Sequence, residues 1–200
     1  MSNKPMLAWH FLRSDRCLGY NDGRKVQAGK IYRVKGELIR CENGMHGSRR
    51  IIDALSKAPG PIACRVDMIG EIIHYRDESV ARARRMLWSV DATNILHEFA
   101  CRCAEDALAF IDKPDERSVN AIYVKRLWMA GKATDSELAA ARSAARAAAW
   151  WDAADSDAAD SDAAGEAAWD DAWDDARIKQ NRRLTAMVCA AHESSNGGGA

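Results

Sequence analysis

The chain has 200 residues, equal numbers of acidic and basic side chains, and 48% hydrophobic residues. This length suits one domain, or one domain with an appendage, and the composition suits a packed core. No apolar run approaches the roughly 20 residues that a membrane-spanning helix needs, and the N-terminus lacks the apolar stretch of a signal peptide. We therefore expect a cytoplasmic protein without a membrane partner. Nothing marks secretion, so the six cysteines are expected to be free thiols.

The neutral net charge hides a strong asymmetry along the chain. Residues 1–65 hold thirteen Lys/Arg against five Asp/Glu, and residues 133–200 hold six against thirteen. Such a distribution has two interpretations, which the sequence leaves open. The basic and acidic parts attract each other, within one chain or between two chains, or each part has an external partner.

The first third of the chain predicts a small antiparallel sheet with one helix. Ile62–Met68 alternates apolar and polar residues, as a half-buried strand does. Ser48 is placed to cap a helix that runs to about Lys57. The other expected strands are Met6–Leu12, a hairpin of Lys30–Val34 with Glu37–Cys41 about Lys35-Gly36, and Glu71–Tyr75 after Gly70.

From Asp77 the spacing of apolar residues predicts helices. The first has Val80, Arg84, Leu87 and Trp88 on one face, and the second opens at Asp91. A third helix covers residues 117–130. Thr134-Asp-Ser-Glu137 then matches a capping box, in which the threonine hydroxyl and the glutamate carboxylate each accept a backbone amide proton.

The capping box begins a long tract of Ala, Asp and Trp, which we expect to be a helical arm. Alanine is the best helix former, and some fifty helical residues would extend roughly 75 Å, so the arm must project or fold back, breaking at Gly165 or at an Asp-Ser pair. Small residues at 3-4 spacing predict a seam for close helix packing. Its members are Ala140, Ala144, Ala147, Trp151, Ala154, Ala158, Ser161, Gly165, Ala168 and Ala172.

The arm is also the candidate binding surface. Ten carboxylates and no Lys or Arg lie between positions 152 and 175. A rigid rod of negative charge has the sign of duplex DNA, although a lower charge density, and could occupy a nucleic-acid channel in another protein. The alternative is a solubilising face. The predicted partner-binding residues are Asp152, Asp155, Asp157, Asp160, Asp162, Glu166, Asp170, Asp171, Asp174, Asp175, Trp169 and Trp173.

Several segments resemble an uncharacterised family of phage and prophage proteins whose members end in Ala/Trp/Asp/Arg tracts. The segments are Trp9-His10-Phe11, Cys41-Glu42-x-Gly44-Met-His46-Gly-Ser48, Asp53-Ala-Leu55, Asp91-Ala-Thr-x-x-Leu96-His97-Glu98-Phe99-Ala100 and Gln180-Asn-Arg-Arg-Leu-Thr-Ala-Met187. The resemblance implies a bacterial host and supplies no chemistry. This chain departs from the family pattern because its tract is strongly acidic, where arginine is often interspersed.

A second resemblance is to ADP-ribosyltransferase-like domains. His10, Gly44–Ser48, Asp53–Leu55 and Ile62–Gly70 follow the order of the early elements of such domains. The aromatic positions and the late catalytic glutamate of that family are not identifiable here. The likeness implies an enzymatic alternative.

Other groups of cysteine, histidine and arginine residues support weaker hypotheses. Cys41, His46, His97 and Cys101 could form a zinc site if a helix packed over a turn, or Cys41 could pair with a histidine as a nucleophile and base. Buried cysteines and hydrogen-bonded histidines explain the same residues, so neither a metal nor a catalytic residue is predicted. The basic side chains Arg49, Arg50, Arg82, Arg84 and Arg85 could touch phosphates, but a solvated helix face is preferred, and direct nucleic-acid binding is not expected.

The sequence thus predicts an α+β protein with an N-terminal antiparallel sheet and helices (1–132), a long Ala-rich helical arm (133–192) and a disordered tail (193–200). The preferred function is non-enzymatic and needs no cofactor. It is a phage or prophage accessory protein that binds and inhibits a host protein or complex, such as CRISPR or another defence system, through the acidic helix as a nucleic-acid mimic. The alternatives are an ADP-ribosyltransferase-like enzyme and a structural oligomerisation module, in which the alanine seam forms a homodimer.

Overall fold

A computed structural model describes residues 5–19, 22–156 and 163–197, with side chains described outside 149–172. The chain divides into two compact units. The sheet unit comprises residues 1–93 together with 177–200, and the helical unit comprises 94–176. This division differs from the expected boundary at residue 132, because the end of the chain returns to the N-terminal part. The expected mixed α+β architecture with an N-terminal antiparallel sheet is confirmed.

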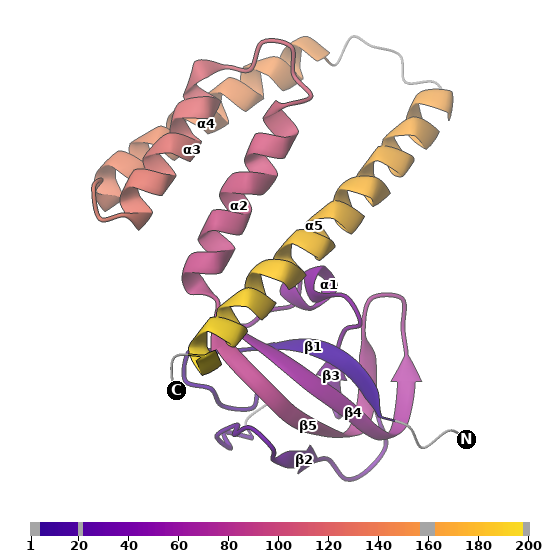
Figure 1. The fold of residues 1–200 in the computed structure, drawn as a ribbon. Coiled ribbons are helices and arrows are strands. Elements are labelled where there is room, and N and C mark those ends of the chain that lie inside the picture. Colours follow the sequence, from indigo (N-terminus) through magenta and orange to yellow (C-terminus); the bar gives the residue numbers. More distant parts are fainter. Residues whose placement is uncertain (1–4, 20–21, 157–162, 198–200) are drawn as a thin grey trace. The chain divides into compact units, whose positions relative to one another are not determined.

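The sheet unit is built on five antiparallel strands (Figure 1). Four of them follow the order β1-β4-β5-β2, and β3 also pairs with β5. A short helix, α1, covers Ile51–Leu55. The strands are β1 (Met6–Leu12), β2 (Ile31–Arg33), β3 (Met45–Gly47), β4 (Ile62–His74) and β5 (Ser79–Asp91).

The helix expected around Val80 and Trp88 was a wrong prediction, since those residues form β5. This strand pairs with β4 from His74↔Ser79 to Ile62↔Asp91, with two register shifts. β4 itself continues past Gly70, whose φ of 83° lies beside one of these shifts. A long ladder of cross-strand pairs therefore overrides a helical spacing that the local sequence also allows.

The hairpin expected about Lys35-Gly36 is also absent from the described residues. β2 pairs with β5, whereas residues 37–41 contribute only an isolated bridge between Ile39 and Asn43. Helix α1 is shorter than expected, and Ser48 does not cap it. The Ser48 backbone instead exchanges two hydrogen bonds with Trp9, at 2.7 and 2.9 Å.

One face of the sheet is covered by the long connections between β1 and β4. Ala8, His10 and Leu12 alternate onto this face opposite Val66, Cys64 and Ile62. Leu18, Tyr32 and Met45 form a second buried cluster from the connecting segments. The segments between β1 and β4 therefore form a cluster of their own, and the candidate site is lined both by these segments and by the sheet.

Helix α5 (Ala163–Gly197) supplies residues 177–197 to the sheet unit. Leu184 and Val188 on this helix are fully buried. His192 stacks on Trp88 with ring centroids 4.1 Å apart, and Trp88 meets Trp9 edge to face. Since Trp9 alternates with His10 along β1, this packing occupies the face opposite the loop layer. The tail expected to be disordered is helical to Gly197, and residues 198–200 lie outside the described part.

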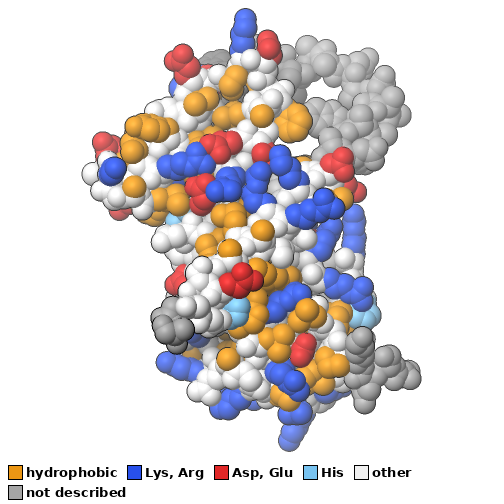
Figure 2. All heavy atoms as spheres, viewed as in Figure 1, with side chains coloured by type: hydrophobic (Ala, Val, Ile, Leu, Met, Phe, Trp, Pro, Cys, Tyr) orange, Lys and Arg blue, Asp and Glu red, His pale blue; other side chains and the backbone are white. Residues whose placement is uncertain are grey.

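The helical unit contains α2 (Thr93–Leu108), α3 (Glu116–Met129) and α4 (Asp135–Ser156). The capping box is confirmed: the Thr134 amide donates to the Glu137 carboxylate at 2.7 Å, and the Glu137 amide donates to the Thr134 hydroxyl at 3.2 Å. On the face shown in Figure 2, Lys/Arg and Asp/Glu side chains lie interspersed over these helices. None of the helices in the described residues is long and apolar enough to cross a membrane.

The alanine seam takes a different face of α4 from the expected one. Leu138, Ala141 and Ala148 are buried, whereas Ala140 and Ala147 are exposed. The single large apolar side chain in the first turns, Leu138, buries more area than any alanine, and it decides which face packs. The break expected at an Asp-Ser pair falls partly outside the described residues, and Gly165 lies within α5.

Candidate functional site

A cavity of about 600 Å³ lies in the sheet unit. Its size is within the range of small-molecule sites. Its apolar wall includes Phe11, Leu18, Val34 and Met45. The polar groups that line it come from three strands, from α1's flanks and from the loops, and they include His10, His46, Ser48, Lys57, Glu78 and Arg84.

Arg84 is the unusual group in this cavity. It stands on β5, is 4% exposed, and donates from Nη1 to the carbonyl oxygen of His46 at 2.6 Å. Among the described residues no carboxylate lies within ion-pair distance of its guanidinium, and burial lowers the pKa of Arg84 to about 10. A buried cation is normally paired, because desolvating an isolated charge is costly. The cavity therefore holds a positive charge that the described side chains do not neutralise.

Two histidines share the cavity with Arg84. The pKa of His10 lies well below 6.5, mainly because the imidazole is buried. The charge of Arg84 lowers this pKa further, and His46 contributes a smaller effect in the same direction. Burial also lowers the pKa of His46, an effect that the Glu78 charge opposes. The His46 ring accepts the Cys41 amide at Nε2, 3.3 Å away, and so holds the loop in which Cys41 has a φ of 63°.

Both imidazoles are therefore neutral at pH 7 in the ligand-free protein. Because the folded pKa of His10 lies below its unfolded value, the unfolded chain binds more protons below about pH 6.5. The contribution of His10 to stability is thus present above that pH and is lost as the pH falls below it. Any anion that neutralises Arg84 would weaken this effect.

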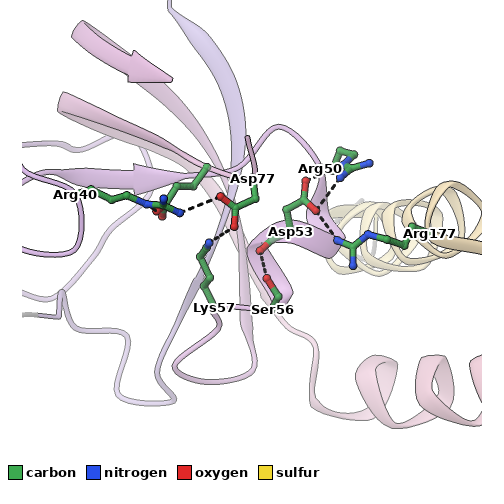
Figure 3. A network of polar contacts seen from close by, with 8 residues as sticks. Arg40, Arg50, Asp53, Ser56, Lys57, Asp77 and Arg177 are labelled. Carbon is green, nitrogen blue, oxygen red and sulfur yellow. Dashed lines mark hydrogen bonds and ion pairs between the residues drawn. The ribbon is translucent and has the colours of Figure 1, made fainter. Parts of the chain in front are cut away.

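Three acidic side chains near the cavity are paired with other cations, whereas the exposed Glu42, which also lines it, forms no ion pair among the described residues. Glu78 accepts from Arg40 Nε at 2.5 Å, and Asp22 forms an ion pair with Arg24 at 2.6 Å. Figure 3 shows Asp77 between Arg40 and Lys57. Because these carboxylates form ion pairs with other cations, Arg84 is available to pair with an anionic ligand.

Helix α1 is tied to α5 through Asp53. Figure 3 shows the buried Asp53 carboxylate between Arg50, at 2.7 Å, and Arg177, at 2.8 Å. The Asn181 side chain also accepts the Ile52 amide, at 3.4 Å. Since α1 carries Ala54, which lines the cavity, the C-terminal helix helps to position one wall of the site.

The predicted binding residues on the acidic arm lie mostly outside the described side chains. Trp173 is described and is 66% exposed, and Asp174 and Asp175 are also exposed. The predicted residues whose side chains are not among those described are Asp152, Asp155, Asp157, Asp160, Asp162, Glu166, Trp169, Asp170 and Asp171. The described part of the arm is thus consistent with a surface open to solvent near Trp173.

The hypothetical zinc ligands are divided between the two units. Cys41 and His46 belong to the sheet unit, whereas His97 and Cys101 belong to the helical unit, where His97 contacts the Trp128 ring. In the described part of the chain, no group of three or more His, Cys, Asp or Glu residues could hold a metal ion. None of the six cysteines, all of which the structure describes, forms a disulfide.

Sequence reasoning missed Arg84 because it assigned Arg82, Arg84 and Arg85 to one solvated helix face. On a strand these neighbours separate: Arg82 binds Glu71 and the Gly36 carbonyl, and Arg85 lies 4.0 Å from Asp67. No local pattern marks Arg84, because its place in the cavity follows from its pairing with Met68 on β4.

Comparison with known proteins adds no identification: no protein family, no curated protein and no solved structure matches this chain. The resemblances to a phage family and to ADP-ribosyltransferase-like domains therefore stay predictions. The site must be interpreted from its own geometry.

Proposed function

We propose that the sheet unit binds a small anionic ligand in the cavity over Arg84. The observation that carries this proposal is the buried guanidinium whose hydrogen-bond partner is a neutral carbonyl oxygen. Preorganised, desolvated arginine side chains are well suited to carboxylates and phosphates, which they bind through parallel N–H donors. The apolar wall would contact the remainder of an organic anion, and the neutral His10 would offer a further hydrogen bond.

A ligand titration tests this proposal. Organic carboxylates and phosphates, added at about 100 times their Kd, are expected to raise the free energy of unfolding by about 2.7 kcal/mol at low ionic strength. The measurement is thermal unfolding followed by tryptophan fluorescence, with neutral molecules of the same shape as controls. NAD belongs in the same panel, since its consumption would support the ADP-ribosyltransferase alternative. Equal shifts with charged and neutral molecules would contradict an anion site.

We also propose, as a second function, that the acidic arm binds a host protein or complex, such as a phage-defence system. This proposal rests on the ten carboxylates between positions 152 and 175 and on the exposed Trp173. Tryptophan is enriched among the residues that contribute most of the binding energy in protein interfaces. The ten carboxylates belong to the helical unit and the anion cavity belongs to the sheet unit, so the two functions are compatible.

Replacing the arm's ten carboxylates by the corresponding amides is expected to abolish capture of that host partner, because the negative field is lost while side-chain size is kept. The measurement is a pull-down from a bacterial host with intact and amidated arms, and the Trp173→Ala variant as a separate comparison. Capture that survives amidation would refute nucleic-acid mimicry. Light scattering over a range of concentrations tests the oligomerisation alternative.

A further inference from the structure

The buried part of the cavity carries the charge of Arg84 and a histidine, His10, that can gain one. Arg84 from β5, His46 from β3 and Cys64 from β4 lie around His10 on β1, and burial raises the pKa of the Cys64 thiol to about 12. The other titratable groups that line the cavity are Arg13, Cys17, Asp22, Cys41, Glu42, Lys57 and Glu78. Among these, Asp22, Lys57 and Glu78 are held in ion pairs, as is Arg13 with Asp15. Glu42 is exposed and forms no ion pair among the described residues, so Arg84 is the buried charge of the cavity, and protonation of His10 would add a second one.

The charge of a ligand decides whether those imidazoles stay neutral. A carboxylate carries one negative charge, which Arg84 alone would balance. A phosphate monoester carries about −1.5 to −2 at pH 7. The excess negative charge would reverse the influence of Arg84 on His10, because an anion within contact distance favours the protonated imidazole. The two ligand classes thus differ in the number of protons that the protein takes up from solvent when the ligand binds.

Building on the proposed anion site, we propose that the natural ligand is a small phosphate monoester, held by Arg84 together with an imidazolium at His10. On binding, an imidazole nitrogen of His10 takes up a proton from solvent, and no bond of the ligand is made or broken. The ester group lies against the apolar wall, which a bare phosphate ion would leave uncovered. A cavity of about 600 Å³ provides room for such an organic group.

The position of His10 supports this assignment over a carboxylate. Without a ligand, burial and Arg84 keep His10 neutral, so this imidazole can gain a proton when an anion enters the cavity. A carboxylate would leave that arrangement without a role, because Arg84 already matches its charge. A dianion uses both Arg84 and a protonated His10, so it accounts for more of the cavity's composition.

Isothermal titration calorimetry with phenyl phosphate and benzoate tests the inference on the full-length protein. The two probes share a ring and differ in the charge of the head group. Phenyl phosphate is expected to bind at least tenfold more tightly than benzoate at pH 7. Repeating the titrations in buffers of different ionisation enthalpy gives the proton count, which should be about one for phenyl phosphate and near zero for benzoate. The affinity for phenyl phosphate should increase as the pH falls from 8 to 6.5.

The His10→Gln variant retains a hydrogen-bonding side chain that cannot become charged. It is expected to bind phenyl phosphate more weakly and without proton uptake, while its affinity for benzoate changes by less than threefold. If this variant fails to fold, the number of protons that the wild-type protein takes up with each probe still tests the phosphate assignment. Equal affinities for both probes without proton uptake would overturn the phosphate assignment and leave the anion site standing. Failure of both probes to bind would overturn the assignment and the proposed function together.

Discussion

Replacing Arg84 by methionine is expected to abolish anion binding while leaving the fold intact. Methionine fills a similar volume but brings no charge, so affinity should fall by at least tenfold, which corresponds to about 1.4 kcal/mol. Loss of the Arg84 donor leaves the His46 carbonyl unsatisfied, at a cost of about 1–3 kcal/mol. Removing a buried cation without a counter-charge offsets a comparable amount. We therefore expect the free energy of unfolding to change by less than about 2 kcal/mol.

Urea unfolding with and without phenyl phosphate measures both effects in one experiment. Arg82→Met is the matched control, because Arg82 stands two residues away on the same strand and does not line the cavity. The control should retain the ligand-induced stabilisation that Arg84→Met loses. A loss of stability well above 3 kcal/mol in Arg84→Met, with normal ligand binding in the folded fraction, would make Arg84 a structural residue and remove the basis of the proposed site.

The parts of the fold that sequence reasoning predicted are those whose signals are local. The Thr134 and Glu137 pair lies within one turn, so its chemistry can be interpreted without knowing the rest of the fold. The alternation in Ile62–Met68 likewise depends on residues that are adjacent in sequence. Helices α2 and α3 were predicted within a few residues of their observed bounds, because their apolar spacing is sustained over several turns.

The parts that were missed depend on contacts between distant segments. β5 is a strand because β4 offers it a partner along its length, although its own spacing fits a helix. The candidate site needs His10, His46 and Arg84 from three different strands, and only the sheet register brings them together. The acidic tract was recognised from its unusual composition, whereas nothing in the composition distinguishes the buried Arg84 from the other arginines.

Replacing Leu184 by alanine is expected to destabilise the sheet unit by about 2–4 kcal/mol, the usual range for a fully buried leucine. Leu184 is completely buried on the part of α5 that belongs to this unit. Ile178→Ala is the matched control, since Ile178 lies on the same helix and is 43% exposed, and it should cost less than about 0.5 kcal/mol.

Chemical unfolding followed by tryptophan fluorescence measures this difference, because Trp88 stacks on His192 of the same helix. If both variants cost the same, the C-terminal helix would be an independent appendage. The expected difference has a consequence for the cavity: Arg177 holds Asp53, and Asp53 anchors the helix that carries Ala54 into its wall. Leu184→Ala should therefore also weaken phenyl phosphate binding by a small factor, while Ile178→Ala leaves it unchanged. A destabilised variant with unaltered affinity would show that the cavity is shaped by the sheet and loops alone.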